Sequence, residues 1–245
     1  MRGTGNRNTL ASLVLLLAHA AGAAAALVQP GRDTDVAEVL AAPTVRVAAA
    51  MAAATPQDIG IVERQARSEI QLARQTGDSR YWGRAQAMLH RWWDREDAPP
   101  PLALLQATVH QGRHEFAAAR RILEQLVARS PGHAQAWLNL AALDRLQARY
   151  ATALRSCAAV EVAGAPLYGR ACRLETISLQ GRHTEAADGL RTLVRTGQDQ
   201  DQRSWLMSLL AESLERAGQD AQAQIAYRDS LQAQSDLYTA IALSD

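Results

Sequence analysis

The sequence predicts an all-α fold, a solenoid of antiparallel helix pairs, and three observations support this prediction. Alanine supplies much of the 48% apolar content while aromatic residues make up only 4%. Alanine favours helices, whereas strands favour aromatic and β-branched residues. Apolar residues then recur at three- and four-residue steps after about residue 57, and the pattern of large and small residues repeats from about residue 99.

The first 26 residues have the features of a secretory signal peptide. Arg2 and Arg7 precede a short apolar run from Leu10 to Ala18, and small residues in A-x-A patterns follow it. This run is shorter than the roughly 20 residues that span a bilayer, so we expect cleavage, with an uncleaved anchor as the alternative. No Cys lies near the cleavage region, which argues against a lipoprotein anchor. The expected location is therefore periplasmic or secreted.

Residues 27–56 are predicted to be a flexible leader, because prolines and a glycine interrupt an alanine-rich stretch. A helical pattern then runs from Ile59 to Ala73, and Gly77 ends it, since glycine suits the position after a helix. A second helix is expected from about Tyr81 to Trp93. The stretch Asp97–Pro101, with three consecutive prolines, is expected to break the chain.

After these prolines, residues of similar size recur about 34 positions apart. Phe116 and Tyr150 correspond in this way, and so do the small residues Ala119 and Ala153. Two looser copies follow, and the extra residues between them are placed in a loop at Gly197–Arg203. The predicted units are a divergent repeat at 57–98, repeats at about 99–132, 133–166, 167–202 and 203–236, and a partial repeat at 237–245.

This pattern resembles the tetratricopeptide repeat, a helix–turn–helix unit with the same period. The resemblance is strongest in the segment AWLNLAALDRLQARYATAL, which has a large residue early, a small residue at the helix contact and an aromatic residue at the turn. In the looser copies Gly181 and Gly218 take the turn. The resemblance covers about residues 57–245. It implies a right-handed α-solenoid of about four repeats plus a partial fifth, with a concave groove that binds another protein.

In this family the groove is lined by positions of the first helix that face away from the second helix. By register these positions are Thr108, Gln111, Gln135, Leu138, Arg145, Tyr168, Glu175, Ser178, Trp205, Ser208, Glu212 and Glu215. Tyr168 and Trp205 are the most informative, because aromatic residues are enriched in binding hot spots. The far end of the set is acidic, so a basic or apolar segment suits it. The Lys and Asn residues that some family members use to hold a free C-terminus are missing.

Little in the sequence points to chemistry. It contains no Lys, which excludes a Schiff base or a phosphate-loop lysine, and its net charge of +1 gives no strong attraction for nucleic acid. His110 and His114 have the spacing of two metal ligands, but the register places them at a helix end and a turn, which favours a surface position. We therefore expect no catalytic residue, cofactor, metal or small-molecule substrate.

Cys157 and Cys172 fall on the second helix of one repeat and the first helix of the next. In an exported protein such a pair is either a disulfide or two buried thiols, and the sequence does not decide between them.

The expected function is that of a non-catalytic adaptor in the cell envelope, which binds a peptide or helix of another protein in the groove. Membrane contact is expected only through the signal segment if it stays uncleaved. One alternative is a structural or assembly component of an envelope or transport complex, and another is the docking region of a longer enzyme. The second alternative rests on Ser235-Asp236, which resemble the start of a helix that reaches Asp245 without a further capping element. Either the sequence is a fragment of a longer protein, which we favour, or the last helix is itself the cap.

Overall fold

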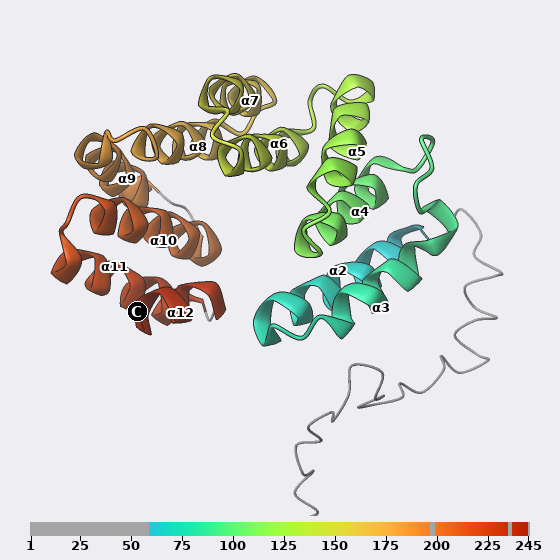
Figure 1. Ribbon diagram of the computed structural model, residues 1–245, viewed down its shortest axis with the longest axis horizontal. Helices are drawn as coiled ribbons and strands as arrows, with labels where there is room; N and C mark the ends of the chain where they lie inside the picture. The colour runs from blue at the N-terminus through green and yellow to red at the C-terminus, as the bar shows by residue number, and fades with distance from the viewer. Residues whose placement is uncertain (1–58, 197–198, 235–236, 245) are drawn as a thin grey trace, which may run out of the picture. The chain divides into compact units, whose positions relative to one another are not determined.

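The computed structural model describes residues 59–196, 199–234 and 237–244, all within one compact unit, Val45–Asp245. Every element in these ranges is a helix, and successive helices lie against one another as pairs joined by short turns (Figure 1). The predicted all-α solenoid is therefore confirmed. None of the described helices is both long and apolar enough to cross a bilayer. The predicted signal peptide, the leader and Ser235-Asp236 lie outside the described residues.

The helices follow the predicted order of pairs. The first pair is α2 (Ile59–Thr76) and α3 (Arg80–Leu89), and a 3₁₀ turn, η2 (His90–Trp92), follows it. The later pairs are α4 (Pro100–Gly112) with α5 (Phe116–Arg129), α6 (Ala134–Leu146) with α7 (Tyr150–Val162), α8 (Pro166–Ser178) with α9 (His183–Thr196), and α10 (Gln200–Arg216) with α11 (Asp220–Ala233). The last described helix is α12 (Leu237–Ser244).

Three predicted turn glycines adopt the left-handed backbone conformation that ends a helix. Gly77 has a φ of 69°, Gly181 a φ of 90° and Gly218 a φ of 71°. Glycine enters this region without the steric cost that a Cβ imposes, so these residues explain why α2, α8 and α10 stop where they do. The turn between α4 and α5 uses His114 instead, with a φ of 60°.

Three predicted boundaries are wrong. The predicted loop Gly197–Arg203 is too long, because α10 begins at Gln200, where the Asp199 carboxylate accepts a hydrogen bond from a backbone N–H of the first turn. The prolines after Asp97 do not only break the chain; α4 starts at Pro100, since proline is favoured in the first turn of a helix. The helix expected to reach Trp93 ends earlier, at Leu89, and tightens into η2.

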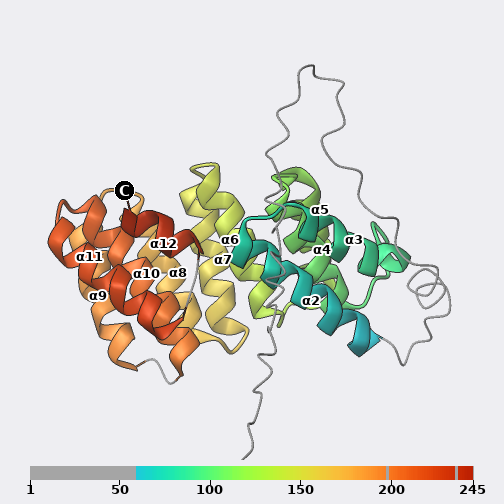
Figure 2. The same ribbon diagram turned by 90° about the horizontal axis from the view of Figure 1, so that it is seen from below.

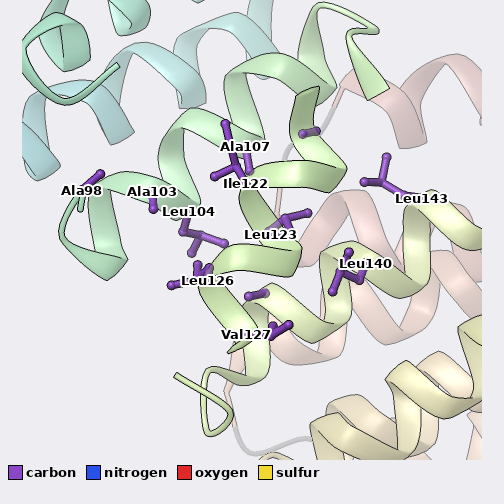
Figure 3. Packing of buried hydrophobic residues seen from close by; sticks show 12 residues of the cluster. Ala98, Ala103, Leu104, Ala107, Ile122, Leu123, Leu126, Val127, Leu140 and Leu143 are labelled. Carbon is purple, nitrogen blue, oxygen red and sulfur yellow. The ribbon is translucent and has the colours of Figure 1, made fainter. Parts of the chain in front are cut away.

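Leucine and alanine side chains of α4, α5 and α6 form one of the cores (Figure 3). Leu123 and Leu126 of α5 are fully buried, and Leu140 and Leu143 of α6 are almost so. Small residues such as Ala107 of α4 lie where two helices approach closely, as the repeat pattern predicts. The leucines then fill the space between one pair and the next.

The next joint, between α7 and α8, is built differently. Cys157 and Cys172 form a disulfide whose Cα atoms are 5.5 Å apart, which answers the question that the sequence left open. Beside it, a Cβ added to Gly169 would clash with the Glu161 side chain and lie 2.8 Å from the carbonyl oxygen of Cys157. The two helices therefore touch at the level of their backbones.

The last helix returns to the first. The start of α12 lies beside the end of α2 in both views (Figures 1 and 2). Leu237 is the contacting residue, because one of its methyl carbons is 3.2 Å from the position that a Cβ on Gly77 would occupy. Residues far apart in the sequence thus border the same space.

Candidate functional site

Helices from both ends of the described chain enclose a cavity of about 900 Å³, which we call the groove. One wall comes from α2, α4 and α6, and the other from α10, α11 and α12. The lining residues are Arg67, Ile70, Gln71, Arg74, Gln75, Leu104, Leu105, Thr108, Gln135, Asn139, Asp201, Ser204, Trp205, Ser208, Leu209, Glu212, Ser230, Gln234, Tyr238 and Thr239. This volume lies within the range typical of ligand sites in proteins.

Several residues chosen by register line this groove. Thr108 and Gln135 belong to the first wall, and Trp205, Ser208 and Glu212 to the second. These residues lie on α4, α6 and α10, which are the first helices of their pairs. One face of each of these helices packs against the second helix of the pair, and the opposite face borders the groove.

Two further register residues contact the lining without belonging to it. The ring of Tyr168, on α8, lies 5.2 Å from that of Trp205, a distance typical of aromatic pairs. Gln111 accepts a hydrogen bond of 3.1 Å from Asn139. Tyr168 therefore positions the Trp205 indole, and Gln111 positions the Asn139 carboxamide.

Three charged register residues, Arg145, Glu175 and Glu212, form ion pairs. The Arg145 guanidinium of α6 lies 2.8 Å from the Glu175 carboxylate of α8, and only 10% and 18% of these two side chains are exposed. On α10, Arg216 and Glu212 form a second pair at 2.7 Å. Ser178 accepts a hydrogen bond of 3.4 Å from Arg216, which ties α10 to α8, the helix that carries Glu175.

Burial and like charge set the ionisation of this cluster. Burial raises the pKa of Glu175, the nearby Glu212 charge raises it further, and Arg145 opposes both effects. The pKa of Tyr238 is raised chiefly by the Glu212 charge, with smaller contributions from burial and from the hydrogen bond it donates to Glu212. Glu212 thus interacts both with Arg216 of its own helix and with the Tyr238 phenol of α12.

Glu215 lies away from the groove. Its carboxylate accepts a hydrogen bond of 2.9 Å from the Tyr227 hydroxyl of α11, the second helix of its pair. Burial of the phenol and that bond raise the pKa of Tyr227. Of the carboxylates that the sequence assigned to the acidic end of the groove, Glu175 and Glu212 are therefore paired with arginines, and Glu215 faces α11 instead of the groove.

Register reasoning missed part of the lining. Asn139 lies one helical turn after Gln135, so the same rule would have found it. Gln71 and Gln75 belong to the divergent first pair, and Tyr238 belongs to the partial last repeat, so the repeat pattern was not carried onto them. Nothing in the sequence signals that α2 and α12 face the same space.

A smaller cleft of about 360 Å³ is lined by α5, α6 and α7. Asp144 lies in it, with only 1% of its side chain exposed. One carboxylate oxygen accepts hydrogen bonds of 2.8 Å from Arg120 and 3.0 Å from Arg149, while the other has no partner among the described residues. This ion pair ties α5 to α6 and to the turn before α7.

His110 is buried, contrary to the surface position that the sequence favoured. Its Nδ1 lies 2.6 Å from the Glu115 carboxylate, and its ring stacks 4.7 Å from that of Trp93. The segment that follows the divergent first pair packs over this end of α4 through Trp93, and the repeat register did not predict this contact. His114 lies in the turn, as predicted.

No protein-family profile matches the sequence, and no curated protein matches it. Solved structures match by shape. One is a crystal structure of TTC0263, a thermophilic TPR protein in Thermus thermophilus, with a TM-score of 0.59 and 18% identity over 75% of this chain and 97% of that chain. Another holds the TPR-like repeats of a putative kinesin light chain of Podosopora anserina, with a TM-score of 0.46 and 17% identity over 74% of this chain and 97% of that chain. At these identities the likeness to the first structure establishes the fold.

Proposed function

We propose that this chain, which has the tetratricopeptide-repeat fold, is a non-catalytic scaffold that holds another protein by a peptide or helical segment in its groove. The observation that carries this proposal is the groove itself, about 900 Å³ in volume and lined from both ends of the array. A fold of this kind presents an extended concave surface, and its function depends on what that surface recognises.

The groove suits a segment that is recognised by polar contacts around an aromatic anchor. Carboxamides contribute to both walls, among them Gln71, Gln135, Asn139 and Gln234. Gln135 donates to Asn139, which in turn donates to Gln111, but each of these carboxamides keeps a further donor and acceptor for a peptide backbone or a polar side chain. Trp205 supplies the anchor, since Tyr168 already supports one side of its ring.

The carboxylates contribute less than their number in the sequence implies, because Glu175 and Glu212 are occupied by Arg145 and Arg216. We therefore expect affinity to depend weakly on salt, in contrast to a groove that attracts a basic peptide over a distance.

The proposed location is the periplasm or the outside of the cell. The signal-peptide pattern of residues 1–26 motivates it, and the disulfide between Cys157 and Cys172 supports it, because disulfides persist in oxidising compartments. Mass spectrometry of the protein from cells, alkylated before lysis, tests the proposal. An N-terminus near residue 27 and an oxidised pair are expected, whereas an intact N-terminus with two alkylated cysteines would contradict it.

Photo-crosslinking tests the proposed function. A benzophenone amino acid replaces Gln135, which lines the first wall, and the protein is irradiated in an envelope fraction. One cross-linked partner is expected when this residue is the only change, and none when Trp205→Ala is added. Val162→Ala is the matched control, because Val162 is 90% exposed and lies outside the groove. Cross-links that survive Trp205→Ala would remove the groove from the proposal.

A second candidate, a structural or assembly role, is favoured by exposed apolar residues at one end of the array. Ile225 of α11 and Tyr238 and Ile241 of α12 are each more than half exposed. Analytical ultracentrifugation distinguishes the two roles. A concentration-dependent oligomer that persists after Trp205→Ala would support assembly, and a monomer at all concentrations would exclude self-association as its basis.

A further inference from the structure

The helix α12 belongs to the second wall of the groove and is held there by its own core contacts. Ala242 and Leu243 pack against the core of α10 and α11. Thr239 is 2% exposed and lines the groove. The Tyr238 hydroxyl donates a hydrogen bond to Glu212 of α10. These contacts fix α12 to the second wall.

The same helix also reaches the first wall. Leu237, its first residue, lies against Gly77 at the end of α2. Gly77 has no side chain, so the leucine can approach its backbone. Its left-handed backbone is one that L residues rarely adopt, which favours glycine at this position. A methyl carbon of Leu237 lies 3.2 Å from the position that a Cβ there would fill, so the contact is close.

We propose that α12 is a strap that joins the two walls of the groove, with the Leu237–Gly77 contact as its catch, and that release of this catch regulates access to the groove. This inference rests on the proposed function of the groove. Leu237 is only partly buried, and contacts with little buried apolar surface open locally far more often than the whole protein unfolds. A segment that needs a wider groove would therefore compete with the catch.

The chain offers a clean probe of this access. Both of its cysteines are in the disulfide, so a cysteine introduced at Ser208 is the sole free thiol of the full chain. Ser208 lines the groove and is partly buried. The rate at which a polyethylene-glycol maleimide alkylates Ser208→Cys reports how often the groove admits a bulky molecule.

Leu237→Ser removes the catch. We expect it to raise the alkylation rate about fivefold, because the locally open form of the groove becomes more populated. Ile241→Ser is the matched control, since Ile241 lies on the same helix but is 53% exposed. Tyr238→Phe, which loses the bond to Glu212 but keeps the ring, should give a smaller increase. Circular dichroism melts identify a variant that fails to fold, and Leu237→Ala, which shortens the same side chain without adding a polar group, then carries the test.

Equal rates in the parent, Leu237→Ser and Tyr238→Phe would overturn the strap, and so would an equal increase in Ile241→Ser. Alkylation needs no partner, so its result is independent of the cross-linking experiment. A groove that opens as expected but captures nothing would contradict the proposed function alone.

Discussion

Two neighbouring joints of the helical array solve the same packing problem with different residues. Between α5 and α6, leucines fill the space, and Asp144 bridges Arg120 and Arg149 at the edge. Between α7 and α8 the helices touch at Gly169, and the small core beside them contains alanines and the two cysteines. Close approach leaves little apolar surface to bury, so the second joint has a covalent link where the first has leucines. Four predictions test this difference.

The largest effect is expected in the leucine-filled joint. Leu126→Ala should lower the free energy of unfolding by about 4 kcal/mol, because it removes a fully buried side chain and leaves a cavity. Urea unfolding followed by circular dichroism measures it. Leu146→Ala is the control, since Leu146 is 67% exposed and should change stability little. Similar losses in both variants would show that the leucine core does not carry this joint.

The disulfide should contribute slightly less. Its cysteines are separated by 15 residues in the sequence, and a loop of this size corresponds to about 3 kcal/mol in the chain-entropy model. Cys157→Ala combined with Cys172→Ala should lower the free energy of unfolding by about that amount. Reductant should destabilise the parent protein and leave the double variant unchanged. Insensitivity of the parent to reductant would mean that the close helix contact suffices by itself.

Gly169→Ala tests the close contact. The new methyl group would meet the α7 backbone, so we expect a loss of about 2 kcal/mol, despite the better helix propensity of alanine. Gly83→Ala is the matched control in α3, where an added Cβ has nothing within 4 Å, and it should gain about 1 kcal/mol. The same sign of change at both sites would contradict the proposed backbone contact.

The smallest effect concerns pH, through Glu175 beside the second joint. Its pKa is raised above the ordinary value of 4.5, so the folded state binds this proton more tightly than the unfolded chain. The stability that this group contributes is therefore fully present below about pH 4.5 and is lost as pH rises through the raised pKa. Glu175→Gln removes this dependence. Its stability relative to the parent should rise in urea titrations as the pH rises from about 4.5 through the raised pKa of Glu175, and a constant difference would contradict the burial effect.

Local signals in the sequence predicted the helices and most of their ends. Gly77, Gly181 and Gly218 mark helix ends because their conformation is a local requirement, and the alternation of large and small residues marks each pair. Helix starts were harder to place, because a run of prolines can either interrupt a chain or begin a helix. Pro100 begins α4. Helix pairing is thus readable at short range.

The groove needed information of another kind. Register placed Trp205 and Gln135 on the lining, because the face of a first helix follows from the repeat. It did not show that Arg145 and Arg216 form ion pairs with Glu175 and Glu212, or that α2 and α12 border the same groove. These facts depend on how much the array turns from one pair to the next, and small rotations accumulated over several pairs leave no local pattern.

The backbone contact at Gly169 also limits how this array can grow or be rearranged. Repeats that meet through ordinary side chains can be duplicated or exchanged, since each copy offers its neighbour a similar surface. The helix that packs on α7 contributes a glycine and a cysteine to this contact, and the matching positions of α6 hold Gln135 and Leu138. We therefore expect the segment from Ala134 to Thr196 to act as one double module, with new repeats tolerated better on either side of it than within it.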